Sequence, residues 1–169
     1  MGQAIAATNK RLACDVVIVE DYEALATEMA NALRRQGLSV QVALDGTRAL
    51  AMALQCTPRV ALVDCALPDT DGIQLVRQLG LAWPETTFLV VSGQIAGITA
   101  NLANELRILA FLNKPLPMRA LAKAVEQLVR TPPDEKTVHN TRKAWIALGL
   151  GSPAEGTADV ALAPHPKQS

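Results

Sequence analysis

Residues 59–64 read RVALVD, a short apolar run that ends in the carboxylate of Asp64. Residues 16–21 read VVIVED, a second apolar run that ends in the carboxylates of Glu20 and Asp21. Continuous apolar runs of this length are typical of strands buried on both faces of a parallel sheet. The carboxyl ends of such strands lie at one edge, so we expect the three carboxylates to meet there. A cluster made of carboxylates alone suits a hard divalent cation such as Mg²⁺.

Short apolar runs alternate with segments of helical period along most of the chain. We expect five strands, at 15–20, 38–43, 59–64, 87–92 and 109–113. We expect five helices, one carrying Leu25, Met29 and Leu33, and the others at 46–56, 72–80, 97–107 and 118–130. Strands that alternate with helices through short connections predict an α/β fold, a doubly wound sheet of five parallel strands flanked by five helices.

The pattern changes after Arg130, where Thr131 and two prolines suit the start of a new helix. A C-terminal helix is expected over 132–149, with Val138, Trp145 and Leu148 on one side. Because an isolated helix of this length is marginal in water, it should dock on helix 118–130, on a second copy, or on a partner.

The expected organisation is a main domain at 13–130, an amphipathic helix at 131–150 and a disordered tail at 151–169, which is rich in Gly, Pro and Ala. Trp145 has two readings, an exposed docking anchor or a residue packed back on helix 118–130. The sequence leaves both open.

The composition limits the function classes. Sixteen Lys and Arg balance sixteen Asp and Glu. This balance argues against nucleic acid or a membrane surface as the main partner. Residues 131–169 are too few and too neutral for a DNA-binding domain, so no direct DNA binding is expected. Three cysteines without a CxxC pair fit reduced thiols, and no signal peptide or membrane span is readable. We therefore expect a soluble cytoplasmic protein.

Four motifs at the ends of the expected strands resemble the receiver domain of two-component response regulators. They read VVIVED at 16–21, VDCALPDTDG at 63–72, VVSG at 90–93 and FLNKP at 111–115. They occur in the family's order, and the resemblance covers residues 13–130. It implies a flavodoxin-like, CheY-like fold and a protein that takes part in phosphorelay signalling.

The resemblance also implies a role for each site residue. Asp64 would be the phosphoacceptor, a carboxylate nucleophile toward a phosphohistidine or a small acyl phosphate. Lys114 would pair with Asp64 and later with the phosphoryl group. Ser92 would donate a hydrogen bond to a phosphoryl oxygen, and Phe111 would be the switch aromatic, without a hydroxyl to hold it outside.

The resemblance implies a metal site as well. Asp21 and Asp64 would bind Mg²⁺ directly, Glu20 through water and Ala66 through its backbone carbonyl. A cis Lys114–Pro115 peptide would aim the lysine. Ala66 and Gln94 would flank the path of the water that removes the phosphoryl group.

The predicted function is therefore that of a stand-alone phosphoacceptor receiver, which catalyses only its own phosphorylation and dephosphorylation. Its phosphodonor would be a sensor histidine kinase or a histidine phosphotransfer protein. Its output would be a contact with a downstream protein or a homodimer. Residues 107–110 read RILA in place of the family's usual glycine-containing turn, which predicts a more apolar output face.

Two alternatives stay open. One is a pseudo-receiver, a scaffold or dimerisation module that keeps the fold without phosphorylation. The other is a metal-dependent hydrolase with Asp64 as nucleophile, which would need an acid at position 66, where the chain has Ala. For Glu20 alone, a solvated or helix-capping carboxylate is an equally good interpretation.

Overall fold

The computed structural model describes residues 14–93, 100–132, 134 and 138–147. Within them, five parallel strands form one sheet in the order β2-β1-β3-β4-β5. The strands are β1 (Val16–Val19), β2 (Val40–Ala43), β3 (Val60–Asp64), β4 (Thr87–Ser92) and β5 (Ile108–Asn113). The predicted five-stranded parallel sheet is confirmed.

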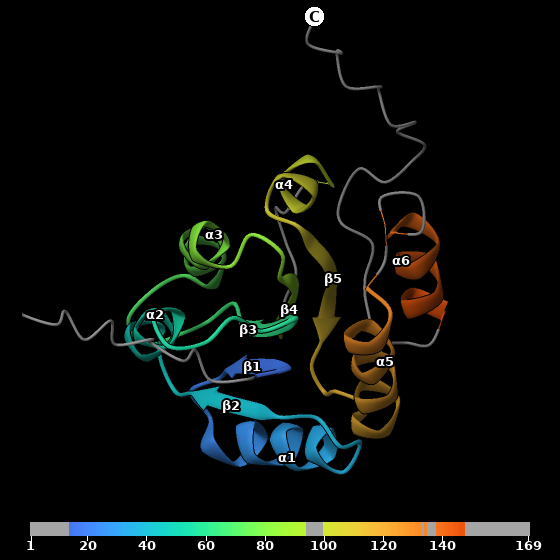
Figure 1. Ribbon diagram of the computed structural model, residues 1–169, viewed down its shortest axis with the longest axis horizontal. Helices are drawn as coiled ribbons and strands as arrows, with labels where there is room; N and C mark the ends of the chain where they lie inside the picture. Colours follow the sequence, from blue (N-terminus) through green and yellow to red (C-terminus); the bar gives the residue numbers. More distant parts are fainter. Residues whose placement is uncertain (1–13, 94–99, 133, 135–137, 148–169) are drawn as a thin grey trace, which may run out of the picture.

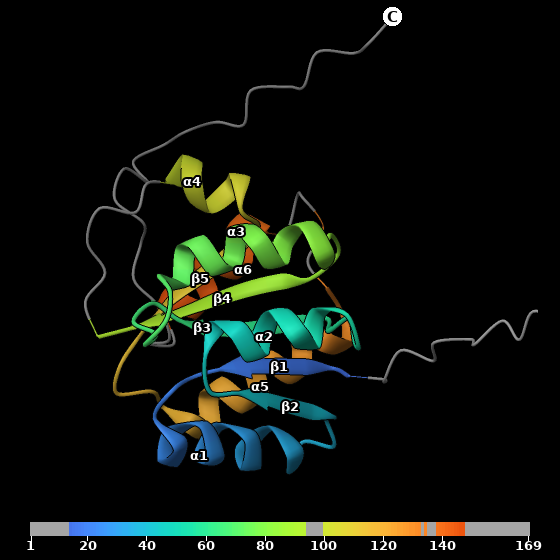
Figure 2. The same cartoon turned by 90° about the vertical axis from the view of Figure 1, so that its left-hand side faces the viewer.

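Helices cover both faces of the sheet (Figures 1 and 2). On one face lie α1 (Glu23–Arg34) and α5 (Met118–Arg130), and on the other lie α2 (Gly46–Ala53), α3 (Gly72–Ala82) and α4 (Ala100–Glu105). The chain moves one way across the sheet from β1 to β2 and the other way from β2 through β3 to β5. Because crossovers between parallel strands are as a rule right-handed, this reversal places helices on both faces. The bounds differ from the predicted ones by a few residues, and residues 97–99 of predicted helix 97–107 lie outside the described part.

Two apolar clusters explain why the central strands are apolar throughout. Val16 and Ile18 of β1 belong to the cluster under α1 and α5, whereas Val17 and Val19 belong to the cluster under α2 and α3. Successive side chains of a strand point to opposite faces, so a strand covered on both faces needs apolar residues at every position. All four of these valine and isoleucine side chains are buried. The buried sheet fixes the positions of the polar residues that follow its strands.

Local signals in the sequence set the ends of several helices. Asp45 caps α2 by accepting from the backbone N–H of Arg48 at 2.7 Å. Asp71 caps α3 by accepting from the N–H groups of Ile73 and Gln74. Gly37 follows α1 with a φ of +80°, a conformation that favours glycine.

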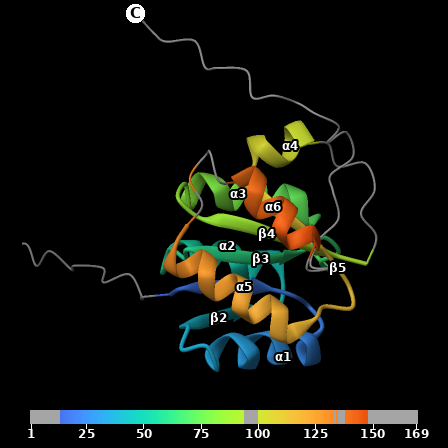
Figure 3. The same cartoon turned by 90° about the vertical axis from the view of Figure 1, so that its right-hand side faces the viewer.

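The C-terminal helix α6 (Val138–Ala147) lies beside β5, the edge strand, and near α5 (Figures 1 and 3). It is shorter than the predicted helix 132–149, and Leu148 and the predicted tail 151–169 lie outside the described residues. Trp145 is 4% exposed and belongs to the same apolar cluster as α1 and α5. Trp145 is therefore packed on the domain and is not an exposed docking anchor. The helix that carries it contacts mainly β5 rather than α5.

None of the helices in the described part of the chain is long and apolar enough to cross a membrane.

Candidate functional site

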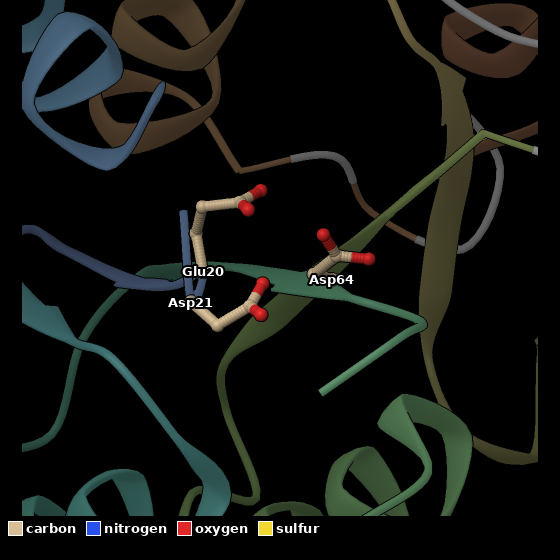
Figure 4. A group of neighbouring side chains, drawn as sticks. All are labelled: Glu20, Asp21 and Asp64. Carbon is tan, nitrogen blue, oxygen red and sulfur yellow. The ribbon is translucent and has the colours of Figure 1, made fainter. Parts of the chain in front are cut away.

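Three carboxylates meet at the carboxyl edge of the sheet (Figure 4). Val19 of β1 pairs in register with Val63 of β3, so the residues that follow them, Glu20 and Asp64, lie beside each other. Glu20, Asp21 and Asp64 each offer a carboxylate oxygen, and these oxygens all lie within 4.8 Å of one another. The predicted acidic cluster is thus assembled by strand register alone.

Lys114 supplies the positive charge of the site. It follows β5, and its Nζ contacts Oδ2 of Asp64 and lies 2.9 Å from Oε2 of Glu20. The backbone N–H of Lys114 donates to the carbonyl of Ser92 at 3.0 Å, and the Lys114–Pro115 peptide is cis. The end of β5 therefore holds the lysine directly across β3 and β4 from the acidic pair.

Burial and ion pairing shift the pKa values of Glu20 and Lys114 in opposite directions. Burial raises the pKa of Glu20, and the close contact with the charge of Lys114 offsets only part of this rise. Burial alone would lower the pKa of Lys114, but its bonds to the carboxylates of Asp64 and Glu20 outweigh that effect and raise it. Lys114 therefore stays a cation. The three carboxylates of the cluster outnumber it, so the cluster can bind a further positive charge.

The carboxylate oxygens of the cluster suit a divalent cation as ligands. Oδ1 of Asp64 accepts from the N–H of Ala66 at 2.9 Å, and Oε1 of Glu20 accepts from the N–H of Tyr22 at 3.2 Å. Oε2 of Glu20 is buried and has the ion-pair contact with Lys114, but it accepts no well-directed hydrogen bond from the described residues. Three carboxylates with one cation and an under-satisfied buried oxygen match the oxygen-rich ligand set that Mg²⁺ prefers.

The other predicted site residues lie around this centre. Ser92 ends β4, is 5% exposed and pairs in register with Asn113. Phe111 of β5 is buried in the cluster under α2 and α3. Ala66 is exposed two residues after Asp64. Gln94 lies outside the described residues.

The loop after Asp64 is held by residues to which the sequence motif gave no separate role. Asp69 accepts from the N–H groups of Gly46 and Thr47 at the start of α2, both at 2.9 Å, and these bonds lower the pKa of Asp69. Asp71 caps α3, and the N–H of Gly72 donates to the carbonyl of Cys65 at 3.0 Å. For Asp71 the sequence carries a signal, because an Asp directly before a segment of helical period is typical of an N-cap.

Residues 16–126 match the family described as the response regulator receiver domain. This match spans the sheet, the acidic cluster and Lys114. The chain belongs to the response regulator receiver family. Receiver domains of this family bind Mg²⁺ through an acidic pocket and interact with histidine kinases. The family is not one of catalytic enzymes in the usual sense.

Curated relatives share this domain within longer proteins. The receiver is 29% identical over 142 residues to the transcriptional regulatory protein TrcR of Mycobacterium tuberculosis, covering 80% of this chain and 51% of that protein. It is 31% identical over 126 residues to the sensor kinase CckA of Brucella abortus, covering 73% of this chain and 13% of that protein. The chain spans about half the length of the first curated relatives it matches. The relative TrcR is named as a transcriptional regulatory protein. The comparisons therefore do not support the expectation that this protein does not bind DNA directly.

Solved receiver structures have the same fold. A CheY-like receiver domain from Methanospirillum hungatei superposes with a TM-score of 0.64 at 22% identity, covering 70% of this chain and 95% of that one. A response regulator from Burkholderia pseudomallei, solved with a phosphorylated aspartic acid, a calcium ion and citrate, gives a TM-score of 0.61 at 24% identity over 76% and 75% of the two chains. At these identities the structures establish the fold, and the predicted CheY-like fold is confirmed.

Proposed function

We propose that this receiver domain accepts a phosphoryl group on Asp64 and signals through a phosphorylation-dependent protein contact. The observation that carries the proposal is the position of Asp64, which is 4% exposed and lies between the acidic pair and Lys114. A carboxylate in this position is fixed by its neighbours and faces the open edge of the sheet. It can act as a nucleophile toward phosphorus while the N–H of Ala66 still holds its Oδ1.

The transfer needs little covalent chemistry from the protein. An oxygen of Asp64 forms the new O–P bond while the P–N bond of a phosphohistidine breaks, and the imidazole nitrogen keeps the electron pair. With acetyl phosphate the bond that breaks is P–O, and acetate leaves. The negative charge on the phosphoryl oxygens must be neutralised as the group moves, which is the main task of the surrounding site.

Lys114 is the residue proposed to follow that charge. Its Nζ contacts Asp64 in the resting site, so it needs only a small movement to reach an oxygen of the bound phosphoryl group. Glu20, Asp21 and Asp64 are proposed to hold Mg²⁺, with the carbonyl of Ala66 as a further ligand. When bound, the ion would supply the positive charge that three carboxylates and one lysine lack.

Ser92 and Phe111 are proposed to report the change to the rest of the domain. Ser92 lies at the end of β4 beside the site, and its hydroxyl would donate to a phosphoryl oxygen. Phe111 is already buried in this structure and has no hydroxyl that would favour an outward position. The proposed switch therefore depends more on Ser92 than on rotation of Phe111.

The phosphodonor is proposed to be a sensor histidine kinase or a histidine phosphotransfer protein, in line with the family. The pseudo-receiver alternative is disfavoured because Asp64, Lys114 and the acidic pair are all present and in contact. The hydrolase alternative is disfavoured because Ala66 offers no second acid beside the nucleophile.

Intact mass spectrometry after incubation with acetyl phosphate and Mg²⁺ tests the proposal. The native chain should gain the mass of one phosphoryl group, and Asp64→Asn should gain none. Glu85→Gln removes an exposed carboxylate before β4 and serves as the matched control, which should be phosphorylated like the native chain. Equal incorporation in the native chain and Asp64→Asn would exclude Asp64 as the acceptor. No incorporation in any chain, with the fold intact, would support the pseudo-receiver.

A further inference from the structure

Among the described residues, the edge strand β5 is covered by α6 and not by another strand. β5 pairs with β4 on one side, and α6 contacts it from the other (Figures 1 and 3). An uncovered edge strand presents unpaired backbone groups that can bind a foreign segment. The covering of this edge is therefore a feature with consequences for what the domain can bind.

A β-bulge creates the polar half of this contact. Phe88 of β4 pairs with Ile108 and Leu89 pairs with Ala110, so Leu109 is an extra residue without a partner in β4. In a regular strand the carbonyls of neighbouring residues point to opposite sides, but a bulge breaks this alternation. The carbonyls of Ile108 and Leu109 both reach the same side here. Each of them accepts a hydrogen bond from α6.

Arg142 makes those hydrogen bonds. Its Nη2 donates to the carbonyl of Ile108 at 2.7 Å, and its Nε donates to the carbonyl of Leu109 at 2.9 Å. Its Nη1 donates to Oδ1 of Asn104 in α4 at 2.8 Å. The planar guanidinium with several fixed donors suits such a set of acceptors, and a lysine in its place could not reproduce the geometry. Arg142 thus connects α6 to both β5 and α4.

Trp145 makes the apolar half of the contact. It lies three residues after Arg142, on the same side of the helix, and is 4% exposed. It belongs to one cluster with Leu109 and Ala110 of β5 and with Val129 of α5. Arg142 and Trp145 are the two anchors of α6. The residue after each of them, Lys143 and Ile146, is exposed.

α6 depends on this contact for its helical form. It has ten residues, and an isolated helix of that length is not stable in water. Docking and helix formation are therefore one equilibrium, between a covered face with a folded α6 and an open face with an unfolded segment. A competing helix with the same two anchors would bind only the open form.

We propose that α6 is an intramolecular inhibitor of a helix-docking surface formed by α4, β5 and α5, and that this surface binds a partner helix carrying Arg and Trp three residues apart. The anchors of α6 define the chemistry of that partner. Its arginine would bind the bulged carbonyls and Asn104, and its tryptophan would fill the site of Trp145. Because α6 is tethered, its effective concentration is high, and it suppresses binding in trans.

The inference also changes the expected role of the C-terminal segment. The sequence predicts a helix that docks on helix 118–130, on a second copy or on a partner. In the structure the segment covers the domain's own face, so its loss is now expected to expose a binding surface.

A fluorescent peptide of residues 134–149 is the probe, and full-length chains are the receptors. Arg142→Ala/Trp145→Ala should release α6 and bind the peptide about tenfold or more tightly than the native chain does. Lys143→Ala/Ile146→Ala removes one cation and one apolar group from the exposed side of the same helix and should bind like the native chain. A peptide that lacks both anchors should bind none of them.

Equal peptide affinity for the native chain and the double variant would overturn the proposal, as would binding to neither. Dimerisation of the double variant in sedimentation velocity without peptide binding would assign the face to a second copy instead and would also overturn it. These measurements need no phosphorylation, so they are independent of the proposed function of Asp64.

A second readout keeps the test valid if the double variant does not fold. The chain has two tryptophans, so the native protein labelled with 5-fluorotryptophan gives two ¹⁹F resonances. Saturating unlabelled peptide should move the Trp145 resonance to its unfolded position and leave that of Trp83, which is fully buried after α3, unchanged. A Trp145 resonance that does not move at saturation would overturn the proposal.

Discussion

Lys114 and Asp64 are joined from the ends of two strands that do not pair with each other. Asp64 ends β3, Lys114 follows β5, and β4 lies between them. The same Nζ lies 2.9 Å from Oε2 of Glu20 after β1. One cation therefore ties together the ends of three strands, and its loss affects both the chemistry and the stability of the site.

Lys114→Met should reduce the rate of Asp64 phosphorylation by about 100-fold or more, because it removes the fixed cation that faces the transferred group. It should also lower the free energy of unfolding at neutral pH by ~1–3 kcal/mol, since two buried carboxylates lose their partner. The raised pKa of Lys114 means that its contribution is complete below the unfolded pKa and is lost only as the pH rises through the alkaline range.

Acetyl phosphate kinetics and urea unfolding measure the two effects of Lys114→Met. Lys123→Met changes an exposed lysine on α5 and is the control. A native phosphorylation rate in Lys114→Met would remove the lysine from the proposed chemistry.

Mg²⁺ affinity should fall on acidification, beginning at a higher pH than for an ordinary exposed carboxyl. The reason is that burial raises the pKa of Glu20, so the folded protein holds this proton where an exposed glutamate is already ionised. The proton and the cation then compete for the same carboxylate. Amide shifts of residues 20–22 and 64–66 during Mg²⁺ titrations at several pH values measure the effect.

Two variants separate the contributions to Mg²⁺ binding. Asp21→Asn should weaken binding at every pH, whereas Glu20→Gln should remove most of the pH dependence in this range. Glu23→Gln, at the exposed start of α1, should behave like the native chain. An unchanged titration in Asp21→Asn would show that the metal ligands are assigned wrongly.

The lifetime of phosphorylated Asp64 should depend on residue 66. Ala66 is exposed two residues after the acceptor, and its N–H already holds Oδ1 of Asp64. A long polar side chain here could orient or block the attacking water without disturbing that backbone bond. Ala66→Glu should therefore change the lifetime severalfold and leave the rate of phosphorylation nearly unchanged. Ala82→Glu, exposed at the end of α3, is the control, and identical lifetimes would exclude this role.

The sheet and the acidic centre could be predicted because each depends on a local pattern. Apolar runs such as 60–63 identify strands buried on both faces, and the polar residue after each run must lie at the carboxyl edge. The β1–β3 register then brings Glu20 and Asp64 together without any further information.

The docking of α6 could not be predicted in the same way. Periodicity groups Trp145 with Val138, but it gives Arg142 no part in the contact. Arg142 binds backbone carbonyls of a bulge at Leu109, and a bulge leaves no apolar or charge pattern that the sequence would show. The same bulge, with Arg107 at a φ of +56°, also lets β5 begin at Ile108, one residue before the predicted strand.

Trp83 shows a second limit of the sequence pattern. It precedes Pro84 in the connection between predicted helix 72–80 and predicted strand 87–92, yet its side chain is fully buried. Its Nε1 donates to the carbonyl of Cys56 at 2.8 Å. A long-range bond to a backbone carbonyl of this kind is set by tertiary packing and not by local spacing.

Gly72 and Gly80 offer the sharpest test of how the loop after Asp64 is positioned, because they lie in the same helix in opposite surroundings. A Cβ on Gly72 would lie 2.2 Å from the carbonyl oxygen of Asp64 and 2.7 Å from Cα of Cys65, whereas one on Gly80 would meet nothing within 4 Å. Gly72→Ala must therefore push α3 away from the backbone of the phosphoacceptor. We expect it to lower the free energy of unfolding by ~1–3 kcal/mol and to slow the phosphorylation of Asp64.

Gly80→Ala, the matched control, should raise that free energy by ~0.5–1 kcal/mol through helix propensity and leave phosphorylation unchanged. Urea unfolding and acetyl phosphate kinetics on both variants decide the matter, and a Gly72→Ala chain as stable and as reactive as Gly80→Ala would show that this close contact does not position Asp64.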